Sequence, residues 1–188
     1  MTEKTWRRVI SNRDSLSKDE FAWLAKYKAR STYARGMVYQ PVGGLGEGTS
    51  HGYYVMLKVS LAHTALEVLG NATGNNIPVT NAALSNALRA GVFNKLLESS
   101  GRALTRKAGL EFAPSLPKYA EPDSQHSDLK SFLGLCRNLM FHGTFSPSES
   151  GLSSSANRRK LLLTLADDCL AQCETHLDRW LTQVEKSR

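Results

Sequence analysis

The sequence predicts an all-α fold, a helical bundle of four to five main helices. Apolar residues recur at the three- and four-residue spacing of amphipathic helices through most of the chain. No convincing alternation of apolar and polar residues indicates a sheet, although short strands near 37–42 and 110–113 remain open. A chain of 188 residues is also long enough to bury the core of one such bundle.

The N-terminal half contains two expected helices separated by a loop. The first follows a capping box formed by Ser17 and Glu20 and extends to about residue 36. Five glycines and a proline in 39–52 predict the loop. A second helix is expected over 53–70, with Gly70 as its stop signal.

The C-terminal half predicts three more helices and a short helical turn. A helix is expected over 81–101 behind a Thr80 cap, a turn of helix over 102–110, and a helix over 127–143. A long last helix is expected from Arg158 to about Lys186, with an apolar stripe of Leu162, Leu165, Cys169, Cys173, Leu177, Trp180 and Val184. The serine-rich segment before the last helix is expected to be mobile. We expect residues 1–50 to form an N-terminal helix and a Gly-rich loop of unassigned role, and 51–188 to form the bundle.

Charge and composition narrow the class of function. The net charge is +7 and the pI is near 9.5, which favours a polyanionic partner such as a nucleic acid, or reflects a basic surface alone. No apolar run approaches the roughly 18 residues of a membrane span, and no secretory signal opens the chain. We therefore expect a cytoplasmic protein whose three cysteines are buried, reduced thiols.

The sequence "CRNLMFHG", residues 136–143, places polar residues in an otherwise apolar helix end. At 100° per residue, Leu133 and Cys136 face the core, whereas Gly134, Asn138 and His142 fall on the opposite side. This side is either a solvated face or a chemical site. Because a glycine inside a helix costs about 1 kcal/mol relative to alanine, Gly134 suggests that another element packs closely there.

The chemistry of these side chains suits a phosphate substrate. His142 lies at a helix end, where the negative end of the dipole favours its protonated form and brings it toward acid–base use. Arg137 carries a permanent charge that can fork onto phosphate oxygens, and Asn138 can orient the imidazole or bind the substrate. In a regular helix Arg137 and His142 lie about 140° apart, so either the helix unwinds or two copies of the motif meet.

Arg137–His142, "RNLMFH", resembles the motif of the HEPN superfamily, an arginine, often a following polar residue, and a histidine after four to six residues. The resemblance covers about 51–188 and implies a HEPN-like bundle. It also implies a metal-independent endoribonuclease without cofactor, in which two motifs build one composite site across a homodimer. Many members are toxins or phage-defence effectors, which implies a possible cognate antitoxin or regulatory protein.

The resemblance also implies roles for the three motif residues. His142 would deprotonate the ribose 2′-hydroxyl or protonate the leaving 5′-oxygen, Arg137 would stabilise charge on the phosphate, and Asn138 would position one of them. Other members of the superfamily have lost catalysis. The alternative function is therefore a non-catalytic helical module that binds RNA or a partner protein.

Two basic clusters are candidate RNA contacts, with solvated helix starts as the alternative. They comprise Arg158, Arg159 and Lys160 at the start of the last helix, and Arg102 and Arg106 with Lys107. A third set of conceivable RNA or dimer contacts is Trp6, Arg7 and Arg8. Exposed Leu135 and Phe141 are further candidates for a dimer surface.

Three other patterns are weaker candidates for sites. "GGLGEG", 43–48, lacks the lysine and Ser/Thr of a phosphate-binding P-loop and predicts a flexible loop. Cys169, Cys173 and His176 share a helix face, but no fourth ligand is in register, so no metal site is expected. His63 and Glu67, one turn apart, predict a partly buried pair or a support for the face that carries the motif.

Overall fold

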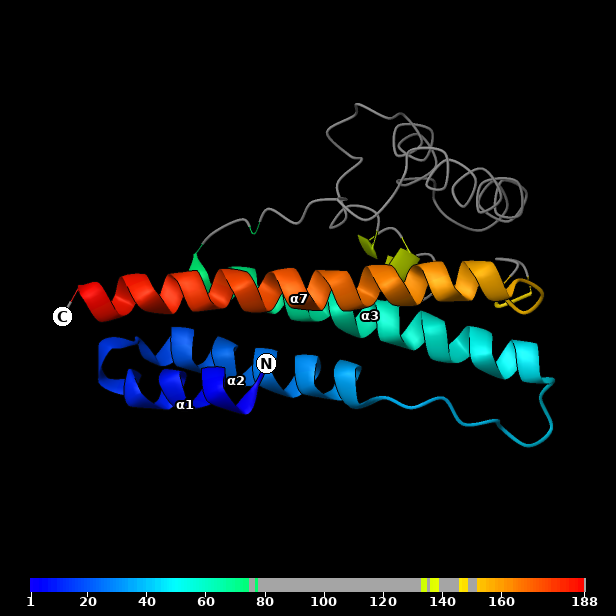
Figure 1. Cartoon of the computed structure of the whole chain (residues 1–188). Coiled ribbons are helices and arrows are strands. Elements are labelled where there is room, and N and C mark those ends of the chain that lie inside the picture. The colour runs from blue at the N-terminus through cyan, green and yellow to red at the C-terminus, as the bar shows by residue number, and fades with distance from the viewer. Residues whose placement is uncertain (75–76, 78–132, 135, 139–145, 149–151, 188) are drawn as a thin grey trace, which may run out of the picture.

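The computed structural model describes residues 1–74, 77, 133–134, 136–138, 146–148 and 152–187, and over these it confirms the all-α prediction. Its helices are α1 (Glu3–Ser11), α2 (Lys18–Gly36), α3 (Glu47–Thr73) and α7 (Ala156–Lys186), with a 3-10 turn, η1 (Arg13–Ser15). No residue in these described ranges is in a strand, the candidate 37–42 included. Figure 1 shows the helices lying lengthwise beside one another.

Helix α1 was not predicted, whereas the start of α2 was predicted correctly. The Ser17 side chain accepts from Glu20 N, and the Glu20 carboxylate accepts from Ser17 N, so the capping box is confirmed. Helix α1 buries only Thr5 and Val9, which leaves a weak apolar pattern in the sequence. It is held partly by ion pairs to α7, since Arg8 lies 3.1 Å from Asp178 and 2.9 Å from Glu185.

Helix α3 is longer at both ends than the predicted 53–70. It begins at Glu47, so the last part of the predicted Gly-rich loop is helical. Gly70 lies inside the helix, and the helix ends instead at Gly74, whose φ of +63° is the left-handed conformation that glycine adopts without strain. The prediction of Gly70 as the stop was wrong because burial against neighbouring helices offsets the cost of a helical glycine.

Helix α7 closely matches the predicted last helix. Ser155 caps it by accepting from Arg158 N. Of the expected apolar stripe, Leu162, Leu165, Cys169, Cys173 and Leu177 are buried. Trp180 and Val184 are partly buried against the same core. The three cysteines are free and buried, as predicted.

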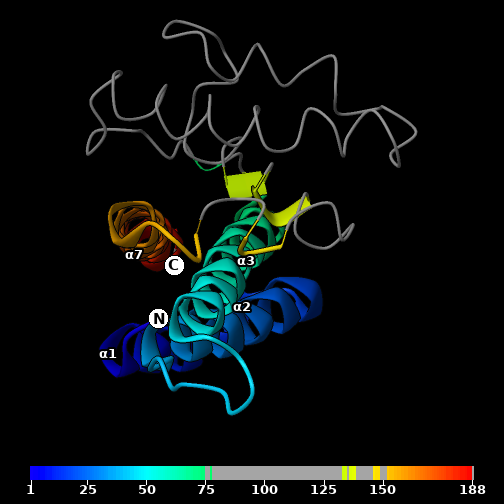
Figure 2. The ribbon, with the colours of Figure 1, turned by 90° about the vertical axis from the view of Figure 1, so that its right-hand side faces the viewer.

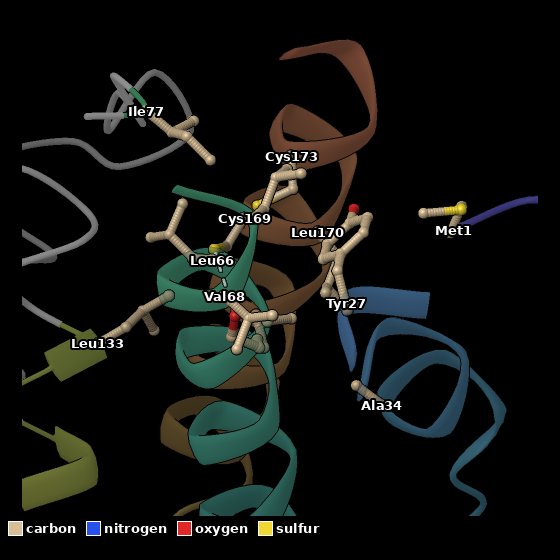
Figure 3. Close-up of a cluster of buried hydrophobic side chains, with 14 of the residues drawn as sticks. Met1, Tyr27, Ala34, Leu66, Val68, Ile77, Leu133, Cys169, Leu170 and Cys173 are labelled. Atoms are coloured by element: carbon tan, nitrogen blue, oxygen red, sulfur yellow. Dashed lines mark hydrogen bonds between the residues drawn. The ribbon is translucent and has the colours of Figure 1, made fainter. Parts of the chain in front are cut away.

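Helix α3 lies at the centre of the described bundle. Helix α2 packs antiparallel to it on one side and α7 runs beside it (Figures 1 and 2). One hydrophobic cluster joins the helices, including Tyr27 of α2, Leu66 of α3, Cys169 of α7 and Leu133 of the motif region (Figure 3). Residues on both sides of position 50 therefore contribute to the same core.

Several predicted elements fall outside the described residues. These are the helices over 81–101 and 102–110, the candidate strand 110–113 and most of the helix over 127–143. Within the described part of the chain, no helix combines the length and apolar character needed to cross a membrane.

A carboxylate of α7 ties the N-terminal helices to the bundle. Glu174 accepts from Thr2 N at 2.8 Å and lies 3.1 Å from Arg35 Nη1 and 3.4 Å from the Met1 amino group. Arg35 also donates to Leu170 O at 2.9 Å. Burial alone would raise the pKa of Glu174, but the hydrogen bonds from Thr2 and Thr5 and the two nearby cations lower it to about 2.

We predict that Glu174→Gln removes part of the acid sensitivity of folding. A carboxyl whose pKa is about 2 when folded, and near 4.5 when unfolded, stabilises the fold above pH 4.5 and loses that contribution as the pH falls toward 2. The variant should be less stable at neutral pH, by about 1–2 kcal/mol after solvent screening. Its melting temperature should also change less between pH 5 and 2.5.

Circular dichroism melts across this pH range provide the measurement. Asp168→Asn, an isosteric change on the same helix at a carboxylate bonded to Gln172, is the control. Equal pH profiles for Glu174→Gln and wild type would contradict the assigned role.

Candidate functional site

Five described residues belong to the segment that carries the Arg–Asn motif. Residues 133–134 and 136–138 are helical, and we refer to them as the motif helix. Leu133 and Cys136 are buried, whereas Arg137 and Asn138 are half-buried, which confirms the predicted phase for these residues. Figure 2 shows the motif helix against α3, on the side away from α2.

Arg137 and Asn138 contact each other directly. Arg137 Nη1 donates to Asn138 Oδ1 at 3.3 Å. The amide oxygen is thereby used to hold the guanidinium, which leaves the donor-bearing Nδ2 end of Asn138 pointing the other way. The two side chains present N–H groups from one short stretch of helix, as an anion site requires.

The third predicted catalytic residue, His142, lies outside the described residues. The same holds for Arg102, Arg106 and Lys107, and for the proposed dimer contacts Leu135 and Phe141. The structure thus brings together Arg137 and Asn138, and the positions of the others remain predictions.

Gly134 is a point of close approach between the motif helix and α3. A Cβ built on Gly134 would lie 2.8 Å from His63 Nε2 and 3.4 Å from its Cε1. The expectation that another element packs closely at this glycine is therefore confirmed. His63 is itself buried, and its Nδ1 lies 3.6 Å from Glu67 Oε2, so the predicted pair is present.

The segment that follows the motif in the chain also packs on α3. A Cβ on Gly52 would lie 2.5 Å from Pro147 Cβ and 3.3 Å from Leu152 Cβ, and one on Gly48 would collide with the carbonyl oxygen of Ser153. Pro147 and Leu152 are buried. The expectation of a mobile serine-rich segment was therefore wrong for 146–148 and 152–155, because two glycines of α3 let this backbone approach closely.

Arg159 of α7 also holds the segment 152–153 in place. Its Nη1 donates to Leu152 O at 2.6 Å and to Ser153 O at 3.1 Å. Lys160 is exposed and Arg158 is half-buried in the same turn of α7. Arg159 thus has a structural role that the sequence did not indicate, whereas RNA contact by these three residues remains a prediction.

An aromatic cluster near the start of α3 was missed by the sequence reasoning. The Tyr39 and His51 rings stack with centroids 4.3 Å apart, and Tyr54 lies edge-on to Tyr39. Burial, and then the charge of Arg159, lower the pKa of His51, with Glu47 acting in the opposite direction. The cluster holds the α2–α3 connection, since Tyr39 Oη donates to Glu47 O at 3.1 Å. In the sequence, the aromatic residues of "HGYY", 51–54, are the feature that could have indicated this cluster.

The surroundings of Cys136 and Cys169 disfavour the reactive thiolate form. Burial raises the pKa of Cys136 to about 12. The hydrogen bond with Cys173, together with burial, raises the pKa of Cys169 well above its usual value. His176 shares a hydrogen bond with Thr73 Oγ1 at 3.3 Å. Across the described ranges, no three His, Cys, Asp or Glu side chains are grouped as metal ligands.

Two of the three candidate contacts near the N-terminus, Trp6 and Arg8, make contacts within the protein. Trp6 packs on Phe21, with ring centroids 5.9 Å apart, and Arg8 forms the ion pairs to α7 described above. Arg7 is exposed and lies 3.8 Å from Glu3. Of the two arginines, Arg7 has the more exposed side chain.

We predict that Gly52→Ala destabilises the protein by about 1–3 kcal/mol, because the added methyl group overpacks a closed contact with Pro147 and Leu152. Gly36→Ala is the matched control, since a Cβ on this α2 glycine meets nothing within 4 Å. It should be neutral or stabilising. Urea denaturation of both variants checks this, and equal midpoints would show that the segment does not close on α3.

Comparison with protein-family models, with curated proteins and with solved structures finds no match to this chain.

Proposed function

We propose that this chain is a metal-independent endoribonuclease that acts on RNA in the cytoplasm as a homodimer. The observation that supports it best is the Arg137–Asn138 pair on a helix packed closely against α3. The next polar position on the same face in the sequence is His142. This combination resembles the HEPN site, and the net charge of +7 favours an RNA partner.

The proposed reaction is an in-line transesterification at a phosphodiester. The ribose 2′-oxygen loses its proton to a base, attacks phosphorus and displaces the 5′-oxygen, which takes up a proton as it leaves. The products are a 2′,3′-cyclic phosphate and a 5′-hydroxyl. His142 serves as the base or the acid, and Arg137 stabilises the charge on the phosphate oxygens. The hydrogen bond to Asn138 restricts the guanidinium and favours a fixed orientation.

A second protomer completes the proposed site. His142 lies five positions after Arg137, so a regular helix would turn the two side chains about 140° apart, too far to converge on one phosphate. Two motifs facing each other would pair the arginine of one protomer with the histidine of its partner. Control by an antitoxin or other regulatory protein belongs to this proposal, as it does in toxins and defence effectors of the superfamily.

We predict that His142→Ala abolishes RNA cleavage and that Arg137→Lys lowers the rate by about 100-fold or more, because lysine keeps the charge and loses the two-pronged geometry. Purified proteins are incubated with mixed cellular RNA in EDTA, and products are tested for 2′,3′-cyclic phosphate ends. Arg30→Lys on α2, on the far side of α3 from the motif helix, is the matched control and should cleave like wild type.

Each other outcome has a distinct meaning. Equal cleavage by wild type and His142→Ala would point to a contaminating nuclease and contradict the proposal. If neither protein cleaves and both bind RNA with a steep salt dependence, the chain is the alternative, a non-catalytic RNA-binding module. If neither protein cleaves or binds RNA, both the proposed function and its RNA-binding alternative are contradicted.

A further inference from the structure

Three residues of α3, Gly48, Gly52 and His63, approach the motif helix and the segment after it from one face of α3. Gly48, Gly52 and His63 lie 4 and 11 residues apart, which places them on the same side of the helix. The two glycines receive the segment after the motif, and His63 meets the motif helix itself. His63 is a buried polar side chain on this face, and an almost fully buried histidine requires an explanation.

The His63 ring fits into a notch created by Gly134. Its Nε2, Cε1 and Cδ2 atoms would lie 2.8, 3.4 and 3.5 Å from a Cβ at this position. The three distances show that the Nε2 edge of the ring faces the motif helix. Any residue larger than glycine would displace the ring or separate the helices.

Helix geometry places this notch beneath Arg137 and Asn138. Residues three and four positions after Gly134 flank it on the same face. Side chains on a helix also lean toward its N-terminus, so those of Arg137 and Asn138 lean over the turn that begins at Gly134. The Nε2 edge of His63 therefore enters the face that carries the polar pair.

Glu67 biases the tautomer of the imidazole through its charge, at a distance too long for a hydrogen bond. Its carboxylate lies 3.6 Å from His63 Nδ1, on the side of the ring opposite the motif helix. A carboxylate beside Nδ1 favours a proton on that nitrogen, and a neutral ring then carries its acceptor at Nε2. Arg137 and Asn138 both carry N–H donors that suit such an acceptor.

We propose that His63, oriented by Glu67, is a positioning residue of the candidate site, which fixes the orientation of the Arg137–Asn138 pair through the notch at Gly134. The inference deepens the proposed ribonuclease function and rests on it for the identity of the substrate phosphate. The coupling of His63 to the polar pair is a property of the fold and can be measured without RNA.

The first test records the side-chain NMR signals of Arg137 Nε–H and Asn138 Nδ2–H₂ in the full chain. They are assigned with Arg137→Lys and Asn138→Asp. His63→Leu, of similar size but apolar, should shift both signals, and Glu67→Gln should shift them in the same direction by less. His63→Gln, which can place an acceptor near the Nε2 position, should return them toward the wild-type values. His176→Gln, a histidine change on α7, should leave them unchanged.

The second test measures cleavage with the same variants at equal folded fraction. His63→Leu and Gly134→Ala should lower kcat at least tenfold with little change in KM, because substrate still binds while the guanidinium is misaligned. His63→Gln should recover most of the rate. Gly36→Ala, the open helical glycine, should match wild type.

The outcomes separate this inference from the proposed function. Unchanged Arg137 and Asn138 signals in folded His63→Leu would overturn it. If His63→Leu does not fold, Glu67→Gln decides, since its carboxylate is 43% exposed and its replacement is isosteric; unchanged signals there would also overturn it. Shifted signals in a protein that cleaves no RNA would support the positioning role and contradict the ribonuclease proposal alone.

Discussion

The burial of more than half of the residues of α3 is the constraint on which the rest of the structure depends. Fifteen of its 27 residues are buried, and they point toward α2, α7 and the motif helix alike. A helix with apolar residues all round is stable in water only when other elements enclose it. The remaining described helices are therefore arranged around α3, and the candidate site lies where the motif helix packs against the face that carries His63.

Two ionisable side chains buried on this central helix lie next to carboxylates. Lys58, only 9% exposed, lies 2.9 Å from Asp167 of α7, and His63 lies beside Glu67 one turn later. An unpaired charge in such surroundings would cost several kcal/mol. A paired charge avoids this cost and favours one relative orientation of the two helices. Lys58 fixes α3 against α7, and His63 meets the motif helix. Buried polar residues of α3 thus specify how its neighbours are oriented.

Glycines set the distances at which the elements around the site approach. Gly48 and Gly52 admit the backbone of the segment after the motif, and Gly134 admits the His63 ring. At each of these positions the missing side chain is replaced by atoms of another element. Close packing of this kind keeps Arg137 half-buried and bonded to Asn138, which restricts the guanidinium more than an exposed helix surface would.

The sequence by itself determined the local features. It predicted the all-α class, the capping box at Ser17, the apolar stripe of α7, the inward phase of Leu133 and Cys136, and a close contact at Gly134. Each depends on helical periodicity or on neighbours within a few residues, which one sequence reports directly. The Arg–Asn motif was also visible in the sequence, but the sequence did not show which residues of other helices lie next to it.

Only the tertiary structure decided what these features contact. It extended α3 through Gly48, Gly52 and Gly70, which local propensity treats as loop or stop signals, because burial against other elements outweighs the helical cost of glycine. It revealed α1, whose ion pairs join Arg8 to residues some 170 positions away in the chain. It also placed His63, far from the motif in sequence, against Gly134. Contacts between distant segments depend on how whole helices pack, and periodicity does not encode which faces meet.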